Sequence, residues 1–322
     1  MVNVIGATVA GQREYLGALY APAETSDGAL FGAALTFRAV PGAEGPDLYV
    51  GAPFNNGDAG AVYRYPFVGW NGDLPTFGAP VAVPNPVAGN IRFGRALAAS
   101  PGGRLFIGAP QAPCGGNQPG AVYIAEPGSQ ALTVLGAGAC GAGNQQGIAL
   151  LAPTDSELLV TALYENGRPD CTALVNTSGL GAVRLYNRQA SGAYAEAWKL
   201  VMPECSTRGY PNFGLNLVRI GDKLLISAEA AGFRTGVDAN GNGGVDQSGA
   251  GRVYAYTYST SAAPGAPTMI SSPTPGTIRF FGTGLTAYDA GGAYVAVGEP
   301  SGSGGTVHFF QLGTDMNGKV TA

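Results

Sequence analysis

The chain is poor in charged side chains, has one histidine and contains no long apolar segment, and these shortages exclude several classes of protein. Charged residues make up 12% of the 322 residues, too few for the solvent-facing sides of long helices. Lys and Arg number 17 against 21 Asp and Glu, giving a net charge of -4. Because nucleic-acid binding requires a basic face, we expect no nucleic-acid partner. No apolar run has the length that crosses a bilayer, so we expect no transmembrane segment.

The start of the chain, Met1-Val2-Asn3-Val4, lacks the charged and apolar regions of a signal peptide. We interpret the chain as a mature form, or Met1 as an added start. Gly (53) and Pro (23) are abundant, yet hydrophobic residues still make up 45% of the chain. Disordered Gly/Pro-rich chains lack that apolar content. Short strands joined by Gly/Pro turns produce this mixture, so the composition predicts an all-β fold.

A three-part phrase recurs five times along the chain. It opens with Phe-Gly-x-x-Leu, continues with an apolar run that ends near Gly-Ala-Pro, and closes with Gly-x-Val-Tyr. The opening parts are residues 31–35, 93–97, 146–150, 213–217 and 281–285, the middle parts 48–53, 105–110, 158–162, 224–228 and 295–300, and the closing parts 60–63, 120–123, 181–184, 251–254 and 305–308. The third copy is degenerate. Repeats of this length indicate stacked units that cover one another's apolar faces.

Each part of the phrase has a structural interpretation. The apolar pieces have strand length and are bounded by Gly or Pro. The Gly of Phe-Gly permits a close backbone approach beside a large packed ring. Pro after Gly-Ala cannot donate to a strand ladder and therefore ends that strand.

These motifs resemble the FG-GAP repeat of integrin α-chain propellers and of bacterial surface proteins, and the resemblance covers nearly the whole chain. The bacterial version is the most similar, because Ala197-Trp198-Lys199-Leu200 and Tyr15-Leu16-Gly17-Ala18 match its outer strand. The resemblance implies one β-propeller domain over residues 1–322, with four-stranded antiparallel blades. The blade cores lie near 31–83, 93–137, 146–202, 213–272 and 281–312, and residues 10–22 complete the last blade. Five blades depart from the seven of integrins.

The four cysteines allow three pairings, with zinc binding as the competing interpretation. No C-x-x-C spacing exists and His308 is the only histidine, which weighs against zinc. With blade strands lettered A to D from axis to rim, B–C and D–A loops share one face of the propeller that the resemblance implies. That face brings Cys114 near Cys140 and Cys171 near Cys205. Two such disulfides indicate an oxidising compartment, so we expect an extracellular or cell-surface protein.

One insertion has a calcium-loop pattern. Asp238, Asn240, Asn242, Gly244 and Asp246 provide oxygen atoms at the spacing of the first part of an EF-hand-like loop. FG-GAP proteins bind calcium through such nonapeptides, but in the A–B hairpin, whereas this stretch lies between B and C. The alternative is a polar, solvated loop. We predict calcium as a cofactor on this pattern.

The long insertions 162–180 and 229–250 lie on the B–C face and are where a binding site is expected. Their candidate ligand-face residues are Tyr164, Glu165, Arg168, Asp170, Phe233 and Arg234. His308 occupies the position of Tyr63, Tyr123 and Tyr254 in other repeats, which favours packing over catalysis. We therefore predict no catalytic residue and expect the protein not to be an enzyme.

Three functions follow from this interpretation. The first is a non-enzymatic recognition or adhesion module that binds a protein or glycan through the B–C and D–A loops. The second is a structural subunit of a larger surface assembly or appendage. The third is a carbohydrate-active enzyme using acidic residues at the propeller mouth, such as Asp170 or Asp246.

Overall fold

The computed structural model describes most of the chain and divides it into two compact units. The described residues are 2–7, 13–72, 74–113, 120–135, 145–165, 179–204, 211–235, 245–247, 249–273, 279–289, 292–300 and 304–313. Unit 1 comprises residues 1–142 and 146–155, and unit 2 comprises residues 143–145 and 156–322.

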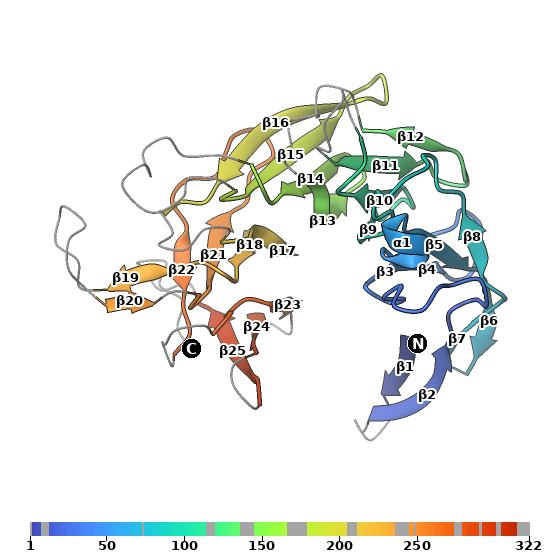
Figure 1. Ribbon diagram of the computed structural model, residues 1–322, viewed down its shortest axis with the longest axis horizontal. Helices are drawn as coiled ribbons and strands as arrows, with labels where there is room; N and C mark the ends of the chain where they lie inside the picture. The colour runs from blue at the N-terminus through green and yellow to red at the C-terminus, as the bar shows by residue number, and fades with distance from the viewer. Residues whose placement is uncertain are drawn as a thin grey trace. The chain divides into compact units, whose positions relative to one another are not determined.

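Unit 1 contains two four-stranded antiparallel sheets (Figure 1). The first has the order β3 (Ala34–Arg38), β4 (Asp47–Ala52), β5 (Ala61–Tyr65) and β8 (Val81–Val83), and the second has the order β9 (Ala96–Ala99), β10 (Leu105–Ala109), β11 (Ala121–Ala125) and β12 (Leu132–Val134). Unit 1 also contains two hairpins, a single turn and one long strand, which are β1 (Val2–Ala7) with β2 (Arg13–Leu19), β6 (Phe67–Asn71) with β7 (Leu74–Phe77), α1 (Asn55–Asp58), and β13 (Gln146–Thr154).

Unit 2 is likewise built from antiparallel strands, each of which pairs with a neighbour in the repeat. Its ladders join β14 (Glu157–Ala162), β15 (Ala182–Arg188) and β16 (Tyr194–Val201); β17 (Phe213–Ile220), β18 (Lys223–Ala228), β21 (Arg252–Thr257) and β22 (Thr268–Ile270); and β23 (Gly284–Asp289), β24 (Ala293–Glu299) and β25 (Thr306–Leu312). A small hairpin of β19 (Phe233–Thr235) and β20 (Val245–Gln247) lies in the insertion after β18.

The core of each unit lies between one sheet and the next. In unit 1, Tyr49 and Val62 of the first sheet pack with Phe93 and Ile107 of the second repeat. In unit 2, Val253 packs with Phe281, Val295 and Phe310 in the same way. All residues of β4, β10 and β14 are buried, as expected for continuous apolar runs covered on both faces.

A repeated backbone turn explains the Phe-Gly motif. The glycine has positive φ in all five copies, at Gly32, Gly94, Gly147, Gly214 and Gly282, a conformation that residues with a Cβ avoid. The residue two positions earlier also has positive φ in all five copies, at Leu30, Arg92, Gln145, Asn212 and Phe280. An ideal Cβ on Gly51 would lie 2.2 Å from the carbonyl oxygen of Gly94. The predicted close backbone approach at Phe-Gly is therefore confirmed.

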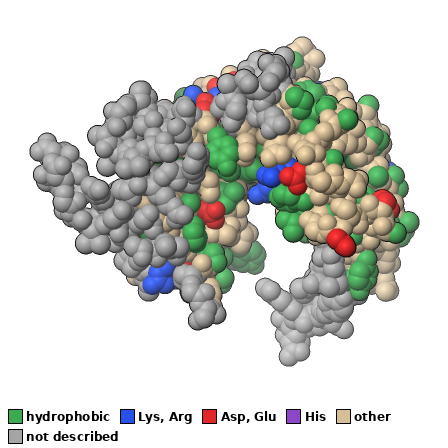
Figure 2. Space-filling view, viewed as in Figure 1, with side chains coloured by type: hydrophobic (Ala, Val, Ile, Leu, Met, Phe, Trp, Pro, Cys, Tyr) green, Lys and Arg blue, Asp and Glu red, His purple; other side chains and the backbone are tan. Residues whose placement is uncertain are grey.

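The all-β class and the four-stranded antiparallel sheets are confirmed. Strand β2, predicted as an outer strand, pairs with β1, a strand that the sequence did not suggest. Within the described ranges, no helix is long and apolar enough to cross a membrane. Figure 2 shows few charged side chains on the coloured surface, in keeping with their low content.

Candidate functional site

The register of the strands aligns the five repeats residue by residue. The closing position pairs with the equivalent residue of the middle strand in each repeat, as Tyr63 with Val50, Tyr123 with Ile107, Arg184 with Val160, Tyr254 with Ile226, and His308 with Val297. Two residues further along the middle strand, the position is occupied by Ala52, Ala109, Ala162, Ala228 and Glu299. The four alanines are at most 1% exposed. The fifth repeat therefore replaces a buried alanine with a carboxylate and a buried ring with the only histidine.

These two replacements contact each other in unit 2. Glu299, the last residue of β24, is 1% exposed, and its Oε2 lies 3.0 Å from Nε2 of His308 in β25. Ser272, which follows β22, donates its hydroxyl to the same oxygen at 2.6 Å. Nη1 of Arg279 lies 3.5 Å from Oε1 of Glu299. One buried carboxylate thus receives three polar partners from three segments of the chain.

The environment determines the charge and tautomer of this cluster. A buried carboxylate is costly unless it is paired and hydrogen-bonded, and the Arg279 guanidinium provides the opposite charge. An ionised carboxylate only accepts hydrogen bonds, so Nε2 of His308 carries the proton that it donates to Glu299. In the neutral ring, Nδ1 then carries the lone pair. Nδ1 makes no hydrogen bond to the described residues.

Packing holds the histidine ring in place. The His308 ring lies 5.7 Å from the ring of Phe281 and 6.4 Å from that of Phe310. Its side chain is 13% exposed. His308 therefore packs as the tyrosines of other repeats do, and in addition it bonds a carboxylate. Its place in the strand alone indicated only packing. The signal for Glu299 was Gly298-Glu299-Pro300 in place of Gly-Ala-Pro.

The predicted ligand-face residue Glu165 lies in a different polar cluster. Glu165 is 6% exposed and forms a two-pronged ion pair with Arg184, which is equivalent to His308, with one contact at 2.5 Å. Lys199 donates to the same carboxylate at 3.0 Å. Since both carboxylate oxygens bind cations, this cluster links β15 and β16 to the segment after β14. Its neighbour Tyr164 is 38% exposed and remains accessible to a ligand.

Most of the other predicted site residues lie outside the described residues. These are Cys114, Cys140, Cys171 and Cys205 of the disulfide prediction, Asp238, Asn240, Asn242 and Gly244 of the calcium prediction, and Arg168 and Asp170 of the ligand face. Asp246 lies in β20 opposite Arg234 of β19, next to Phe233, with only the backbone described. Among the described side chains, no group of three or more His, Cys, Asp or Glu could hold a metal ion.

Comparison with solved structures gives distant likenesses, of which one is described here. No family model and no curated protein matches the chain. The solved structure of an endo-arabinase from Bacteroides thetaiotaomicron VPI-5482 is similar over 85% of this chain and 91% of that chain, at 11% identity and a TM-score of 0.37. This comparison does not support the expectation of a non-enzymatic recognition or adhesion module, which is set aside. The likeness is too distant to assign an activity, which has to be argued from the residues.

Proposed function

We propose that the protein is a carbohydrate-active enzyme that uses His308, oriented by Glu299, for proton transfer. The observation that carries the proposal is the Glu299–His308 pair, because both residues depart from the repeat and bond each other. Packing does not require this pair, since four repeats pack an alanine at the Glu299 position. A carboxylate that accepts one imidazole N–H orients the ring and supports a general acid or base at the other nitrogen.

A carbohydrate suits the chemistry available here. Cleavage of a glycosidic bond requires proton transfer to the leaving oxygen and no cofactor. Most glycosidases use a pair of carboxyl groups, one as general acid and the second as base or nucleophile. We propose that the second comes from the insertions, where Asp170 and Asp246 are the acidic candidates. The exposed ring of Tyr164 offers an apolar surface with a polar edge, as sugar rings require.

The experiment compares the protein with variants that restore the usual residues of the repeat. Activity is measured as new reducing ends released from a panel of plant and bacterial polysaccharides. We expect H308Y and the double variant E299A/H308Y to lose activity by about 100-fold or more, the usual contribution of a general acid or base. Because alanine and tyrosine together are the residues of other repeats, the double variant should keep a melting temperature close to that of the wild type.

The matched control is D222N. Asp222 is 70% exposed and pairs with Lys223 at the surface of unit 2, so its loss should leave activity unchanged. Full activity of H308Y, or no activity of the wild type on any polysaccharide, would overturn the proposed function.

We also propose that the five repeats form a five-bladed propeller of the FG-GAP type, closed by β2 beside β25. The repeated positive-φ turns support the family resemblance. The last sheet has three strands among the described residues, and it exposes Phe309 (74%) and Val307 (58%). In unit 1 the first sheet exposes Phe37 (57%) and Leu35 (47%). Leu97, the residue of the second sheet that is equivalent to Leu35, is 9% exposed. Ring closure would cover both surfaces.

Cysteine pairs placed along β2 and β25 test closure, because neighbouring strands bring Cα atoms within disulfide reach. A linked peptide in a non-reducing digest is expected at one register. Its absence at every register would contradict closure. Calcium binding and a role as a structural subunit stay predictions. A rise in melting temperature with added calcium tests the first, and isolation of the native protein within a larger complex tests the second.

A further inference from the structure

A small cavity in unit 1 is lined by charged side chains, two of which are arginines. Its volume is about 90 Å³, and it is lined by Arg38, Ala39, Val40, Asp47, Tyr49, Arg64, Gly128 and Gln130. The lining residues come from the β3–β4 hairpin, from β5 and from the turn after β11. The cavity therefore lies between the first two sheets, on the side of their hairpin turns.

Arg38 carries a buried positive charge with no carboxylate partner among the described residues. It is 3% exposed, and its guanidinium donates to the carbonyl oxygens of Gly103, Glu126 and Ser129 at 2.8, 2.6 and 3.2 Å. It also donates to the Tyr49 hydroxyl at 3.0 Å. All four acceptors are neutral. Hydrogen bonds to neutral oxygens satisfy the N–H groups but leave the charge uncompensated in a desolvated place.

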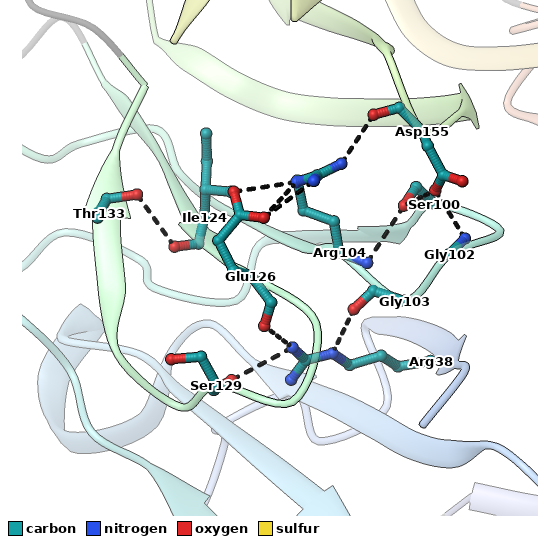
Figure 3. A network of polar contacts seen from close by, with 10 residues as sticks. All are labelled: Arg38, Ser100, Gly102, Gly103, Arg104, Ile124, Glu126, Ser129, Thr133 and Asp155. Carbon is teal, nitrogen blue, oxygen red and sulfur yellow. Dashed lines mark hydrogen bonds and ion pairs between the residues drawn. The ribbon is translucent and has the colours of Figure 1, made fainter. Parts of the chain in front are cut away.

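The carboxylates near Arg38 are already paired with other arginines. Figure 3 shows the Glu126 side chain turned to Arg104, which it binds at 2.9 and 3.1 Å, while Arg38 reaches only the main chain of that segment. Asp47 accepts from Nε of Arg64 at 2.5 Å and from the Phe67 amide at 2.9 Å. Asp47 thus balances one of the two arginines that line the cavity, and a net charge of about +1 remains.

The Arg64 guanidinium has hydrogen-bond donors with no acceptor among the described residues. Its side chain is 29% exposed, and its two terminal nitrogens donate to none of the described residues. The Tyr49 hydroxyl accepts from Arg38 and can donate its own proton. By the repeat alignment, Arg38 and Arg64 correspond to Ser100 and Ile124 of the second repeat. The arginine pair is therefore particular to this cavity and not a requirement of the repeat.

We infer that this cavity binds a small carboxylate, held between the Arg64 guanidinium, the Tyr49 hydroxyl and the charge of Arg38. A planar carboxylate matches the two parallel N–H groups of a guanidinium. A monoanion neutralises the net charge of the cavity, whereas a dianion such as phosphate would leave a surplus negative charge beside Asp47. The site is independent of the proposed catalytic pair, since all its residues belong to unit 1.

The test measures binding of sodium acetate and sodium glucuronate to the full chain by calorimetry and by melting temperature, at constant ionic strength. The variant R64Q removes the free donors and leaves the contacts of Arg38 intact. We expect saturable binding of a carboxylate by the wild type and binding at least about tenfold weaker by R64Q, from loss of charge-assisted hydrogen bonds.

R92Q is the matched control. Arg92 has the same side-chain exposure, 28%, and pairs with one aspartate, Asp58. The equivalent residue in the third repeat, Gln145, is a glutamine with the same positive φ, so R92Q fits the backbone. We expect R92Q to bind carboxylates as the wild type does. Equal stabilisation by chloride, tighter binding of phosphate or sulfate, unchanged binding by R64Q, or no saturable binding would each overturn the assignment.

Discussion

Glycine controls how closely successive repeats approach, and Gly108 gives the clearest case. An ideal Cβ on Gly108 would lie 2.0 Å from the carbonyl oxygen of Gly147 in the next repeat. That oxygen belongs to the buried backbone at the start of β13, so it cannot move aside as a flexible side chain could. Because interiors are close-packed, the strain would spread to both strands.

We therefore predict that G108A lowers the free energy of unfolding by about 3 kcal/mol, the upper part of the range for overpacked cores. Urea denaturation followed by fluorescence measures the change. G265A is the control, because no atom lies within 4 Å of a Cβ built there and its φ is not positive. Its free energy of unfolding should change by less than about 0.5 kcal/mol. Equal effects of the two variants would contradict the close approach.

Single residues were predictable where the chain repeats them. The Phe-Gly turn recurs five times, so its glycine and its packed ring could be inferred from spacing. Glu299 occurs once, and its partners Ser272, Arg279 and His308 are brought to it only by the pairing of β24 with β25 and by the connection after β22. A residue that differs from its equivalents in the other repeats indicates a site only when the structure shows it in contact with a second such residue.

At the scale of elements, a carboxylate after β13 fixes the turn between β9 and β10. Asp155 accepts from the Ser100 hydroxyl and from the Gly102 amide, both at 2.6 Å, as Figure 3 shows. The main chain of Asp155 also accepts from Arg104 at 2.7 Å. The Ser100 hydrogen bond, followed by the Gly102 amide, lowers the pKa of the Asp155 carboxyl below its ordinary value.

A lowered carboxyl pKa predicts acid sensitivity of this turn. The unfolded chain takes up the proton first as pH falls, so the stabilisation is complete above the ordinary aspartate pKa of about 3.9 and is lost as pH falls through the lower folded value. We expect the protection factor of the Gly102 amide, the exchange rate measured by NMR relative to that of an unstructured amide at the same pH, to fall below about pH 4 in the wild type. In D155A exchange should be fast already at pH 6, and the acid step should disappear. An unchanged acid step in D155A would assign it to another carboxyl.

Elements outside the repeat were harder to infer than those inside it. The sequence indicated strands wherever the three-part phrase occurs, but β1 and the β6–β7 hairpin have no counterpart in the described parts of the other repeats. In that hairpin Trp70 packs on Phe67, with ring centroids 5.2 Å apart, yet stays 49% exposed. Such a local aromatic pair stabilises two strands without a buried run, so it leaves no long apolar signal in the sequence.

At the scale of the whole molecule, the buried tyrosines make both units sensitive to alkali. Burial first, then the charges of Tyr63 and Glu24, raise the pKa of Tyr65 to about 12. Burial also raises the pKa of Tyr123 in unit 1 and, in unit 2, the pKa values of Tyr254, Tyr256 and Tyr258. The Tyr65 hydroxyl donates to the Tyr20 carbonyl oxygen at 2.7 Å, a bond that exists only while the phenol is protonated.

An unfolded chain releases tyrosine protons near pH 10, before the folded chain does, so the unfolded state binds fewer protons and stability falls as pH rises. We predict that the melting temperature is constant near pH 8 and decreases steadily between about pH 10 and pH 12. Y65F should be less stable at pH 8 by about 1 kcal/mol, from loss of one hydrogen bond, and its melting temperature should decrease less steeply above pH 10. Absorbance of the phenolate near 295 nm, recorded with the melting curves, assigns the step to tyrosine. A decrease equally steep in Y65F would show that Tyr65 does not contribute, and a constant melting temperature up to pH 12 would contradict the raised pKa values of these five tyrosines.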